Sequence, residues 1–478
     1  MPTTIGFRVL LRVAVIGGGA AGMATASRVK RLLRDRAEVV VFEKTPWVSF
    51  ALCGTPYYLS CKVKTLNDLL HYPLEEFTEK RGINVMLRTE VTDVELDARR
   101  LRYRRLDTGE TGVYEFDYVV FATGARPRAP KNWLRFRNVF TLHSLADADR
   151  LREAVVRDSV RRVIVIGAGY TGIEAADNIA LLGRRVVIVH SSKRILSRSL
   201  DPDIAEKVEE RAKTAGIEFV LGRSVVDVEG SEGYARSVVL DNGEKMYGDL
   251  FVVSMGIEPN VELARRAGVR IGGTGAIWVD TRLRTSREEA YAVGDVAETV
   301  DILTGERIWW PFATAANKMG FVAGTNIAGG DAFFPGVVRT RAMGAFGLYI
   351  AGTGLLEEEA RRMGFDVVTA TLTAHTRARY MGHGPEIVLK VLADANTGML
   401  LGAQALSEDP SAFWRIAVVA TLLMKKASVW DLFNADIGYW PGVNTVWDPL
   451  VVAARLLLRR LGTRPREVSR QDTGSKGA

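Results

Sequence analysis

The feature that most constrains this chain is a glycine-rich turn that occurs twice, each time directly after a run of apolar residues. In the first copy, residues 9–16 read as a buried strand, residues 17–22 (GGGAAG) form the turn, and residues 23–33 follow a helical pattern. Glycines at the first, third and sixth positions of the turn allow a tight bend, close approach to a pyrophosphate, and close helix packing. The helix N-terminus attracts the anion. The pattern therefore predicts a dinucleotide-binding unit.

An acidic residue completes this first unit. The next strand, residues 38–42, is followed by Glu43. This acid lies about twenty residues beyond the last glycine, where an acidic side chain accepts hydrogen bonds from a ribose 2′-hydroxyl. The strand, turn, helix, second strand and acid together indicate a nucleotide site far more strongly than the glycines alone.

The second copy repeats the strand, turn, helix and strand in residues 162–166, 167–172, 173–182 and 185–189. At the place of Glu43, however, it has His190, followed by two serines and then Lys193 and Arg194. No carboxylate is available there to hold a 2′-hydroxyl or to repel a 2′-phosphate, and hydroxyls and cations suit a 2′-phosphate. The second nucleotide is therefore predicted to be NADPH rather than NADH, with NADH left open. The alternative is that the two cations belong to a solvated loop.

Two shorter signals also end strand-like runs. Residues 118–125 lead into the small-residue turn Thr123-Gly124, and residues 290–296 contain Gly294-Asp295. An aspartate after a glycine at a strand end can reach the polyol of a bound flavin. The alternative is an ordinary turn.

Composition excludes several other classes of protein. The chain has 478 residues, too many for one hydrophobic core. Its net charge of +8 is scattered rather than gathered, which argues against nucleic-acid binding and suits phosphorylated ligands. Two cysteines rule out a disulfide-built scaffold and favour a reducing compartment, so we expect a cytoplasmic protein. No stretch approaches the roughly 18 apolar residues of a membrane span. Arg12 interrupts the apolar N-terminal run, so we expect no signal peptide.

From about Val337 the pattern changes. Strand-like runs at residues 344–352, 365–373 and 386–393 are followed by helical runs at residues 411–425 and 449–461. Strands first and helices after predict an α+β domain.

Cys53 lies in the stretch 49–58, just beyond the first nucleotide unit and among small residues. A lone cysteine is more often inert packing than a reactive group. The second cysteine, Cys61, is eight residues further on, roughly 12 Å along a helix. That exceeds the roughly 7 Å that a disulfide tolerates between Cα atoms, although Pro56 can bend the path and leaves an internal disulfide open.

These features together resemble a known family. Two Rossmann units, Ala-Thr-Gly, Gly-Asp and a terminal α+β domain resemble the two-dinucleotide flavoprotein disulfide reductases, up to about Leu461. The run SFALC, ending at Cys53, resembles the single-cysteine branch: coenzyme A disulfide reductase, NADH oxidase and NADH peroxidase. The fold class implied is α/β, with two Rossmann-like dinucleotide-binding domains plus a C-terminal α+β dimerisation domain. The implied FAD-binding domain is residues 1–128 and 262–336, with an NAD(P)H-binding domain at 129–261, a dimerisation domain at 337–461 and a flexible tail at 462–478.

Two local features choose within the branch. Peroxidase and oxidase relatives typically carry a histidine in the first glycine turn, whereas this chain has Ala20. The segment 436–441 (DIGYWP) resembles the tyrosine-proline segment of coenzyme A disulfide reductases, in which the tyrosine, here Tyr439, enters the other subunit's site. The family usually follows this tyrosine with two prolines, a basic residue further along and a tyrosine doublet upstream. This chain instead has WPG, Trp447 and Tyr380-Met381, which puts the identity of the disulfide substrate in doubt.

The resemblance implies an FAD-dependent NAD(P)H:disulfide oxidoreductase that reduces coenzyme A disulfide, or a related small disulfide, in an obligate homodimer. Cys53 would form a mixed disulfide with coenzyme A, a helix N-terminus would lower its pKa, and Tyr439 of the partner would donate a proton. Tyr170 would move aside for the nicotinamide, and Glu174 would orient its carboxamide. The alternatives are a polysulfide or sulfur reductase, an NADH oxidase, and a non-enzymatic flavin redox sensor.

The residues implied in cofactor binding are Gly17, Gly19, Ala20, Ala21, Gly22, Glu43, Lys44, Ser49, Thr123, Gly124, Gly167, Gly169, Tyr170, Thr171, Gly172, Glu174, His190, Ser191, Lys193, Arg194, Gly256, Gly294 and Asp295. Those implied in substrate binding are Arg28, Arg31, Ser49, Arg81, Asn317 and Tyr380. We expect no metal site.

Overall fold

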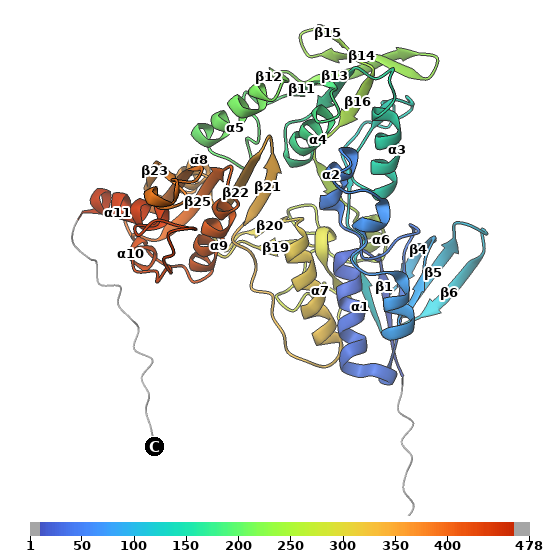
Figure 1. Cartoon of the computed structure of the whole chain (residues 1–478). Helices are drawn as coiled ribbons and strands as arrows, with labels where there is room; N and C mark the ends of the chain where they lie inside the picture. The colour runs from blue at the N-terminus through green and yellow to red at the C-terminus, as the bar shows by residue number, and fades with distance from the viewer. Residues whose placement is uncertain (1–9, 463–478) are drawn as a thin grey trace, which may run out of the picture. The chain divides into compact units, whose positions relative to one another are not determined.

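The computed structural model describes residues 10–462. These residues separate into two compact units: residues 10–198 together with 205–337 form the first, and residues 199–204 together with 338–462 form the second (Figure 1). Past Gly462, the tail expected at 462–478 lies outside the described residues. The domain boundaries expected within the first unit stay predictions.

The first parallel sheet of unit 1 has the strand order β18-β7-β1-β2-β3. Its strands are β1 (Leu11–Ile16), β2 (Ala37–Phe42), β3 (Asn84–Met86), β7 (Tyr118–Phe121) and β18 (Ala290–Ala292). Val13, Val15 and Val41 are fully buried, as expected for a sheet covered on both faces. Helices α1 (Ala20–Leu33) and α7 (Ala313–Ile327) pack so closely that a Cβ at Gly320 would lie only 2.4 Å from the carbonyl oxygen of Ala21.

The second parallel sheet has the order β12-β11-β10-β16-β9. Its strands are β9 (Val139–Phe140), β10 (Arg162–Ile166), β11 (Arg185–His190), β12 (Ile217–Leu221) and β16 (Leu250–Val253). Unit 1 also contains helices α2 (Thr55–Leu59), α3 (Leu145–Val155), α4 (Tyr170–Ala180) and α6 (Glu262–Arg266), and most of α5 (Pro202–Thr214). Two small antiparallel sheets have three strands each: β4 (Thr89–Glu95), β5 (Arg100–Arg105) and β6 (Thr111–Glu115) in one, and β13 (Val225–Ser231), β14 (Tyr234–Leu240) and β15 (Lys245–Tyr247) in the other. Two further antiparallel pairs are β8 (Ala125–Pro127) with β17 (Ile257–Pro259) and β19 (Thr299–Val300) with β20 (Arg307–Ile308).

Both nucleotide-unit helices begin earlier than the sequence pattern indicated. Helix α1 starts at Ala20 rather than at residue 23, and α4 starts at Tyr170 rather than at residue 173. The reason is that Gly19 and Gly169, both in extended conformation, are the N-cap residues, so each helix starts inside its glycine turn.

Unit 2 is built on an antiparallel sheet of order β21-β22-β25-β24-β23. Its strands are β21 (Arg341–Ala345), β22 (Leu348–Gly354), β23 (Val367–His375), β24 (Glu386–Asp394) and β25 (Leu400–Ser407), and its helices are α8 (Glu357–Arg362), α9 (Ser411–Leu423), α10 (Val429–Phe433) and α11 (Pro449–Leu461). The α/β fold class with a separate C-terminal α+β domain is confirmed. The run expected at 344–352 is instead a hairpin, turned by Phe346 and Gly347 at φ of 55° and 77°.

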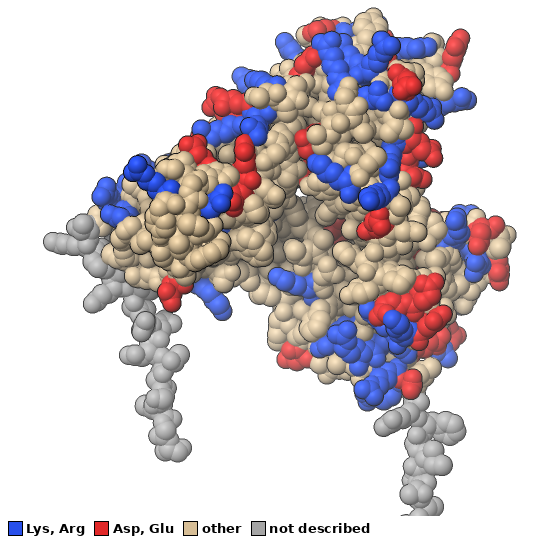
Figure 2. Space-filling view, in the orientation of Figure 1, with Lys and Arg blue, Asp and Glu red and all other residues tan. Residues whose placement is uncertain are grey.

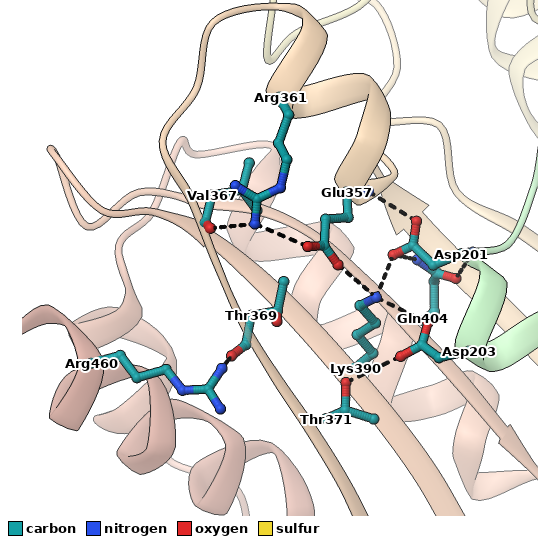
Figure 3. Close-up of polar contacts among 10 residues, drawn as sticks. All are labelled: Asp201, Asp203, Glu357, Arg361, Val367, Thr369, Thr371, Lys390, Gln404 and Arg460. Carbon is teal, nitrogen blue, oxygen red and sulfur yellow. Dashed lines mark hydrogen bonds and ion pairs between the residues drawn. The ribbon is translucent and has the colours of Figure 1, made fainter.

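The short segment Ser199–Ile204 joins unit 2 through a buried lysine (Figure 3). The Nζ atom of Lys390 lies 3.1 Å from Asp201, 3.0 Å from Asp203 and 2.9 Å from Glu357. Gln404 donates to the carboxylate of Asp201 at 2.8 Å and accepts from its backbone N–H at 2.7 Å. Because the lysine and Asp201 are almost fully buried, these contacts hold residues distant in sequence against the sheet.

No helix within residues 10–462 is both long enough and apolar enough to cross a bilayer.

Candidate active site around Cys53

The first glycine turn contains two kinds of glycine. Gly17 has a φ of +112°, and a Cβ there would lie 2.2 Å from the carbonyl oxygen of Ala122. A Cβ on Gly22 would lie 2.0 Å from the carbonyl oxygen of Gly17. Gly19, in contrast, has an ordinary φ of −73°, and the nearest atom to its Cβ position is 4.0 Å away on Phe50. Packing within the protein therefore requires the first and last glycines, whereas Gly19 leaves open space at the start of α1.

The second turn has the same division. Gly167 and Gly172 are closed by backbone oxygens at 2.1 Å and 2.0 Å from their Cβ positions, and Gly169 has no atom within 4 Å of its own. In a dinucleotide motif the third position is where the backbone approaches the pyrophosphate. The open space at Gly19 and Gly169 therefore fits a dinucleotide at each turn. Ala20, Ala21, Tyr170 and Thr171 form the first turns of α1 and α4 beside these openings.

Glu43 is buried and bonded to the first turn. Its carboxylate accepts the backbone N–H of Gly18 at 2.6 Å and that of Thr45 at 2.7 Å. Each carboxylate oxygen can accept a further bond, so the same group fits a ribose hydroxyl. Ser49, at a φ of +54°, donates its N–H to the carbonyl oxygen of Gly18 at 2.9 Å, which ties the cysteine segment to the same turn. Lys44 is exposed beside them.

The remaining residues predicted to bind a cofactor lie in loops after parallel strands. Thr123 donates its hydroxyl to the carbonyl oxygen of Asn260 at 2.7 Å, after β7. Gly124 and Gly256 both have positive φ and open space at the Cβ position. A Cβ on Gly294 would lie 2.8 Å from the Cβ of Ala21, so the turn that carries Asp295 packs on the start of α1. Burial raises the pKa of Asp295 to about 6.

Cys53 lies in the 3-10 turn Leu52–Gly54, directly before α2, and its side chain reaches solvent. Burial by the surrounding protein raises its pKa, and the negative charges of Glu174 and Asp295 raise it further. The expected lowering of this pKa by a helix N-terminus is therefore wrong. Helix α2 has only five residues, and desolvation and the two carboxylates outweigh the backbone hydrogen bond that lowers the pKa. Cys53 therefore lies within electrostatic reach of the second nucleotide unit, through Glu174, and of the turn after β18, through Asp295.

Helix α2 is attached to both neighbouring helices. Tyr57 donates to Glu174 Oε1 at 3.2 Å, and Ser60 donates to Asn178 Oδ1 at 2.6 Å, both on α4. Tyr58 donates to Asp149 of α3 at 2.9 Å. These bonds fix the helix that follows the cysteine against the helix of the second nucleotide turn.

Tyr57 was not among the predicted site residues, although a signal for it was present. It lies four residues after Cys53, a spacing that places two residues on one face of a helix. Cys61 is a free thiol, as is Cys53. The sulfur of Cys61 accepts a hydrogen bond from Arg152 at 3.2 Å.

Tyr170 and His190, two of the residues predicted to bind NAD(P)H, both have contacts in the structure. The ring of Tyr170 meets that of Phe312 edge to face, with centroids 6.2 Å apart. The Nδ1 atom of His190 accepts the backbone N–H of Ala168 at 3.3 Å. Burial, with a contribution from Arg198, lowers the His190 pKa, so its ring is neutral at pH 7. The cationic side chains that follow this neutral ring in the sequence are Lys193 and Arg194, and the exposed Ser191 lies before them.

The predicted substrate arginines on α1 and nearby differ in their contacts. Arg28 donates from Nε to Thr325 at 2.9 Å and lies over the ring of Phe321. Arg81 is held by Glu76 at 3.1 Å and by Ser27 at 2.9 Å. Arg31 is exposed. Asn317 of α7 donates to the carbonyl oxygen of Ala313.

In unit 2, the structure brings together the two tyrosines singled out in the sequence. The hydroxyl oxygens of Tyr380 and Tyr439 are 2.6 Å apart, and both side chains are exposed. This hydrogen bond raises the pKa of Tyr439 above its ordinary value. Figure 2 shows a broad uncharged area on this unit. Large exposed apolar side chains are numerous on unit 2, a density typical of a protein interface. They include Trp414, Trp430, Trp440, Val443, Val446 and Trp447.

Comparison with known proteins places this arrangement in a family. Residues 11–320 match the family model "Pyridine nucleotide-disulphide oxidoreductase", and residues 343–449 match its dimerisation domain. The chain is 44% identical over 446 residues (93% of the chain, 98% of the relative) to an NAD(P)H sulfur oxidoreductase (CoA-dependent) of Pyrococcus abyssi. It is 43% identical over 447 residues (93% and 98%) to an NAD(P)H coenzyme A polysulfide/persulfide reductase of Pyrococcus horikoshii.

A solved structure is also similar: an NAD-dependent persulfide reductase from A. fulgidus superposes with a TM-score of 0.90 at 34% identity, covering 94% of this chain and 83% of that one. The family resemblance seen in the sequence is confirmed. Members of this family are enzymes that use FAD and NAD(P)H. The chain belongs to the pyridine nucleotide-disulphide oxidoreductases and carries their dimerisation domain.

Proposed function

We propose that this protein is a coenzyme A-dependent, NAD(P)H-driven reductase of polysulfide or persulfide sulfur. The observation that carries the proposal is a solvent-accessible Cys53 within electrostatic reach of Glu174, in the second nucleotide unit, and Asp295, in the turn after β18. The names of the relatives at 44% and 43% identity favour sulfur reduction over the coenzyme A disulfide reduction taken as the main hypothesis from the sequence. Coenzyme A disulfide remains the second candidate substrate, because both names include coenzyme A.

The residues present fit both cofactors. FAD would lie on the turn that opens at Gly19, with Glu43 on its ribose and Asp295 on its polyol chain. NAD(P)H would lie on the turn that opens at Gly169, with NADPH favoured by Lys193 and Arg194. The chemistry that bound FAD would supply is acceptance of a hydride from the nicotinamide and delivery of two electrons for cleavage of a sulfur–sulfur bond.

Cys53 is the proposed nucleophile. Its thiolate attacks one sulfur of a sulfur–sulfur bond, the new bond forms to Cys53, and the other sulfur leaves as a thiolate or hydrosulfide. The raised pKa keeps most of this thiol protonated at neutral pH, so the reactive fraction grows as the pH rises.

Tyr439 is the proposed proton donor to the leaving sulfur. Its raised pKa keeps the phenol protonated, so the proton is present when the thiolate leaves. We propose that a homodimer formed through the dimerisation domain presents Tyr439 and Tyr380 of one protomer to Cys53 of its partner. Arg28 and Arg31 would hold the phosphates of coenzyme A, and Arg81 would support them.

The test uses the FAD-loaded protein with NADPH or NADH under argon. Sulfide release from polysulfide, stimulated by coenzyme A and abolished in Cys53→Ser but retained in Cys61→Ser, is the expected result. Intact mass should show added sulfur on wild-type Cys53 and none on the serine variant. A reducible adduct of coenzyme A mass with turnover of coenzyme A disulfide alone would favour the second candidate. NAD(P)H consumption only in the presence of oxygen would indicate an oxidase, and no turnover at all would point to a redox sensor; either result overturns the proposal.

A further inference from the structure

The segment between α10 and α11 that carries Tyr439 is closed by one buried side chain, that of Asn444. The amide oxygen of Asn444 accepts the backbone N–H of Trp440 at 3.0 Å, and its amide nitrogen donates to the carbonyl oxygen of Gly438 at 2.9 Å. Tyr439 is the single residue between these two bonded neighbours. Asn444 is only 6% exposed, so its bonds face little competition from water.

No regular secondary structure holds the backbone of this segment, because residues 438–444 lie in neither a helix nor a strand. The backbone N–H groups of Val443 and Asn444 both donate to the carbonyl oxygen of Trp440, at 2.9 Å and 3.1 Å. Gly442 adds backbone conformational freedom that a residue with a side chain would not. A Cβ at Gly442 would lie 2.9 Å from the Trp440 ring, so the indole occupies the space that the side chain of a less flexible residue would need. The Asn444 side chain is therefore what joins the two ends of the segment.

The closed segment meets the Tyr380 segment at two points. The backbone N–H of Ala378 donates to the carbonyl oxygen of Pro441 at 3.2 Å, and the hydroxyl oxygens of Tyr380 and Tyr439 are 2.6 Å apart. The phenol–phenol bond needs the backbone on either side of Tyr439 to stay in place, because both side chains are exposed and, within residues 10–462, each hydroxyl is bonded to the other phenol alone.

We propose that Asn444 is a positioning residue that holds Tyr439 in register with Tyr380 and so fixes the phenol that donates the proton. The proposal rests on the proposed function in so far as Tyr439 is the acid. Its structural half, that Asn444 maintains the Tyr439–Tyr380 hydrogen bond, stands independently of any reaction.

The experiment compares Asn444→Ala and the near-isosteric Asn444→Asp with a matched control, Thr445→Ala. Thr445 lies in the same loop and donates to the carbonyl oxygen of Trp447 at 2.6 Å, away from Tyr439. The first readout is the pH titration of the Tyr439 phenol by NMR of protein labelled with ¹³C at tyrosine Cζ, assigned with Tyr439→Phe. The second is kcat and KM with polysulfide as the substrate.

We expect Asn444→Ala to move the Tyr439 titration down toward the ordinary tyrosine value and to lower kcat by about tenfold or more, with KM within about twofold. Asn444→Asp, which retains the acceptor for Trp440, should fall between Asn444→Ala and wild type, and Thr445→Ala should match wild type. Adding Tyr439→Phe to Asn444→Ala should cause no further loss of kcat beyond Tyr439→Phe alone.

A Tyr439 titration in Asn444→Ala that matches wild type would overturn the proposal. If Asn444→Ala does not fold, a wild-type titration and kcat in Asn444→Asp would overturn it equally. A wild type that turns over no sulfur substrate would defeat the proposed function while leaving the titration to decide the role of Asn444.

Discussion

At the scale of single residues, the chemistry of Cys53 is governed by charges from outside its own segment. Burial raises its pKa, and Glu174 and Asp295 raise it further. Of these, Glu174 is held by Tyr57, four residues beyond the cysteine. The reactivity of the thiol therefore depends on the second nucleotide unit even before a substrate binds.

We predict that Glu174→Gln shifts the pH dependence of Cys53 alkylation to lower pH. Removing a nearby negative charge stabilises the thiolate, so the thiol pKa falls. At pH 7.5 the rate of reaction with iodoacetamide should rise about threefold or more, since the rate follows the thiolate fraction. The rate is measured by intact mass in a Cys61→Ser background.

Asp149→Asn is the matched control, because Asp149 accepts a hydrogen bond from Tyr58 on the same helix but does not act on Cys53. An alkylation midpoint that is identical in Glu174→Gln and wild type would mean that this carboxylate does not control the thiol.

At the scale of elements, the glycines of each turn have two different roles: the packing of the fold requires the first and the last, and the middle one leaves space for a ligand. Gly22 is required by the backbone, because its Cβ would lie 2.0 Å from the carbonyl oxygen of Gly17. Gly19 is not, because the space beside it is open. Substitutions at these two positions should therefore fail in different ways.

We predict that Gly22→Ala destabilises the protein by about 2 kcal/mol or more through overpacking, with loss of FAD as a consequence. Gly19→Ala should leave the urea midpoint of the apoprotein unchanged or slightly higher, because its φ suits alanine. It should weaken FAD binding by about tenfold or more, because the methyl group occupies the approach of the pyrophosphate. Urea unfolding and flavin fluorescence titration distinguish the two effects. Equal FAD affinity in Gly19→Ala and wild type would show that the open space is not used by the cofactor.

Much of this element scale was predictable from the sequence, and the exceptions have physical causes. The two glycine turns and their strands followed from local patterns that the fold needs. The helix starts were placed three residues late, because apolar periodicity begins only after the N-terminal turn. The sequence pattern predicts a single strand where β21 and β22 form a hairpin, because the turn between them uses an apolar residue, Phe346, beside a glycine. The Cys53 pKa and the role of Asn444 depend on contacts between distant or irregular segments, which no local pattern encodes.

At the scale of the whole molecule, unit 2 depends on the buried charge of Lys390. Although burial works against it, contacts with Glu357, Asp201 and Asp203 raise the Lys390 pKa. Burial likewise opposes the shift at Glu357, but hydrogen bonds from Lys390 and Arg361 lower its pKa. Glu357 thus stabilises the folded protein at pH values above its pKa in the unfolded chain, and this stabilisation is lost as the pH falls through its lowered pKa in the folded protein. Lys390 stabilises the folded protein at pH values below its pKa in the unfolded chain, and this stabilisation is lost as the pH rises through its raised pKa in the folded protein.

We predict that Lys390→Met lowers the free energy of unfolding at pH 7 by about 3 kcal/mol or more, because it leaves the buried Asp201 without its cation. Its stability should also fall less steeply than wild type below about pH 4.5, because the Glu357 pKa is no longer lowered by the lysine. Urea unfolding followed by tryptophan fluorescence measures both effects. Lys245→Met, which removes an exposed pair with Glu229, should change the urea midpoint very little, because solvent screens an exposed ion pair. A similarly small change for Lys390→Met would contradict the prediction.

The attachment of Ser199–Ile204 to unit 2 also bears on how the chain is made. Asp201 leaves the ribosome well before its partner Gln404, which lies 203 residues later in the sequence. Until β24 and β25 are synthesised, the acidic side chains of this segment have neither the lysine nor the glutamine that neutralise and hold them. The C-terminal portion, cut away at residue 337, would conversely enclose a lysine with two of its three carboxylates missing. Assembly of the second unit is therefore an event that only the complete polypeptide can finish, and a nascent or cleaved chain would expose this region to proteases and chaperones.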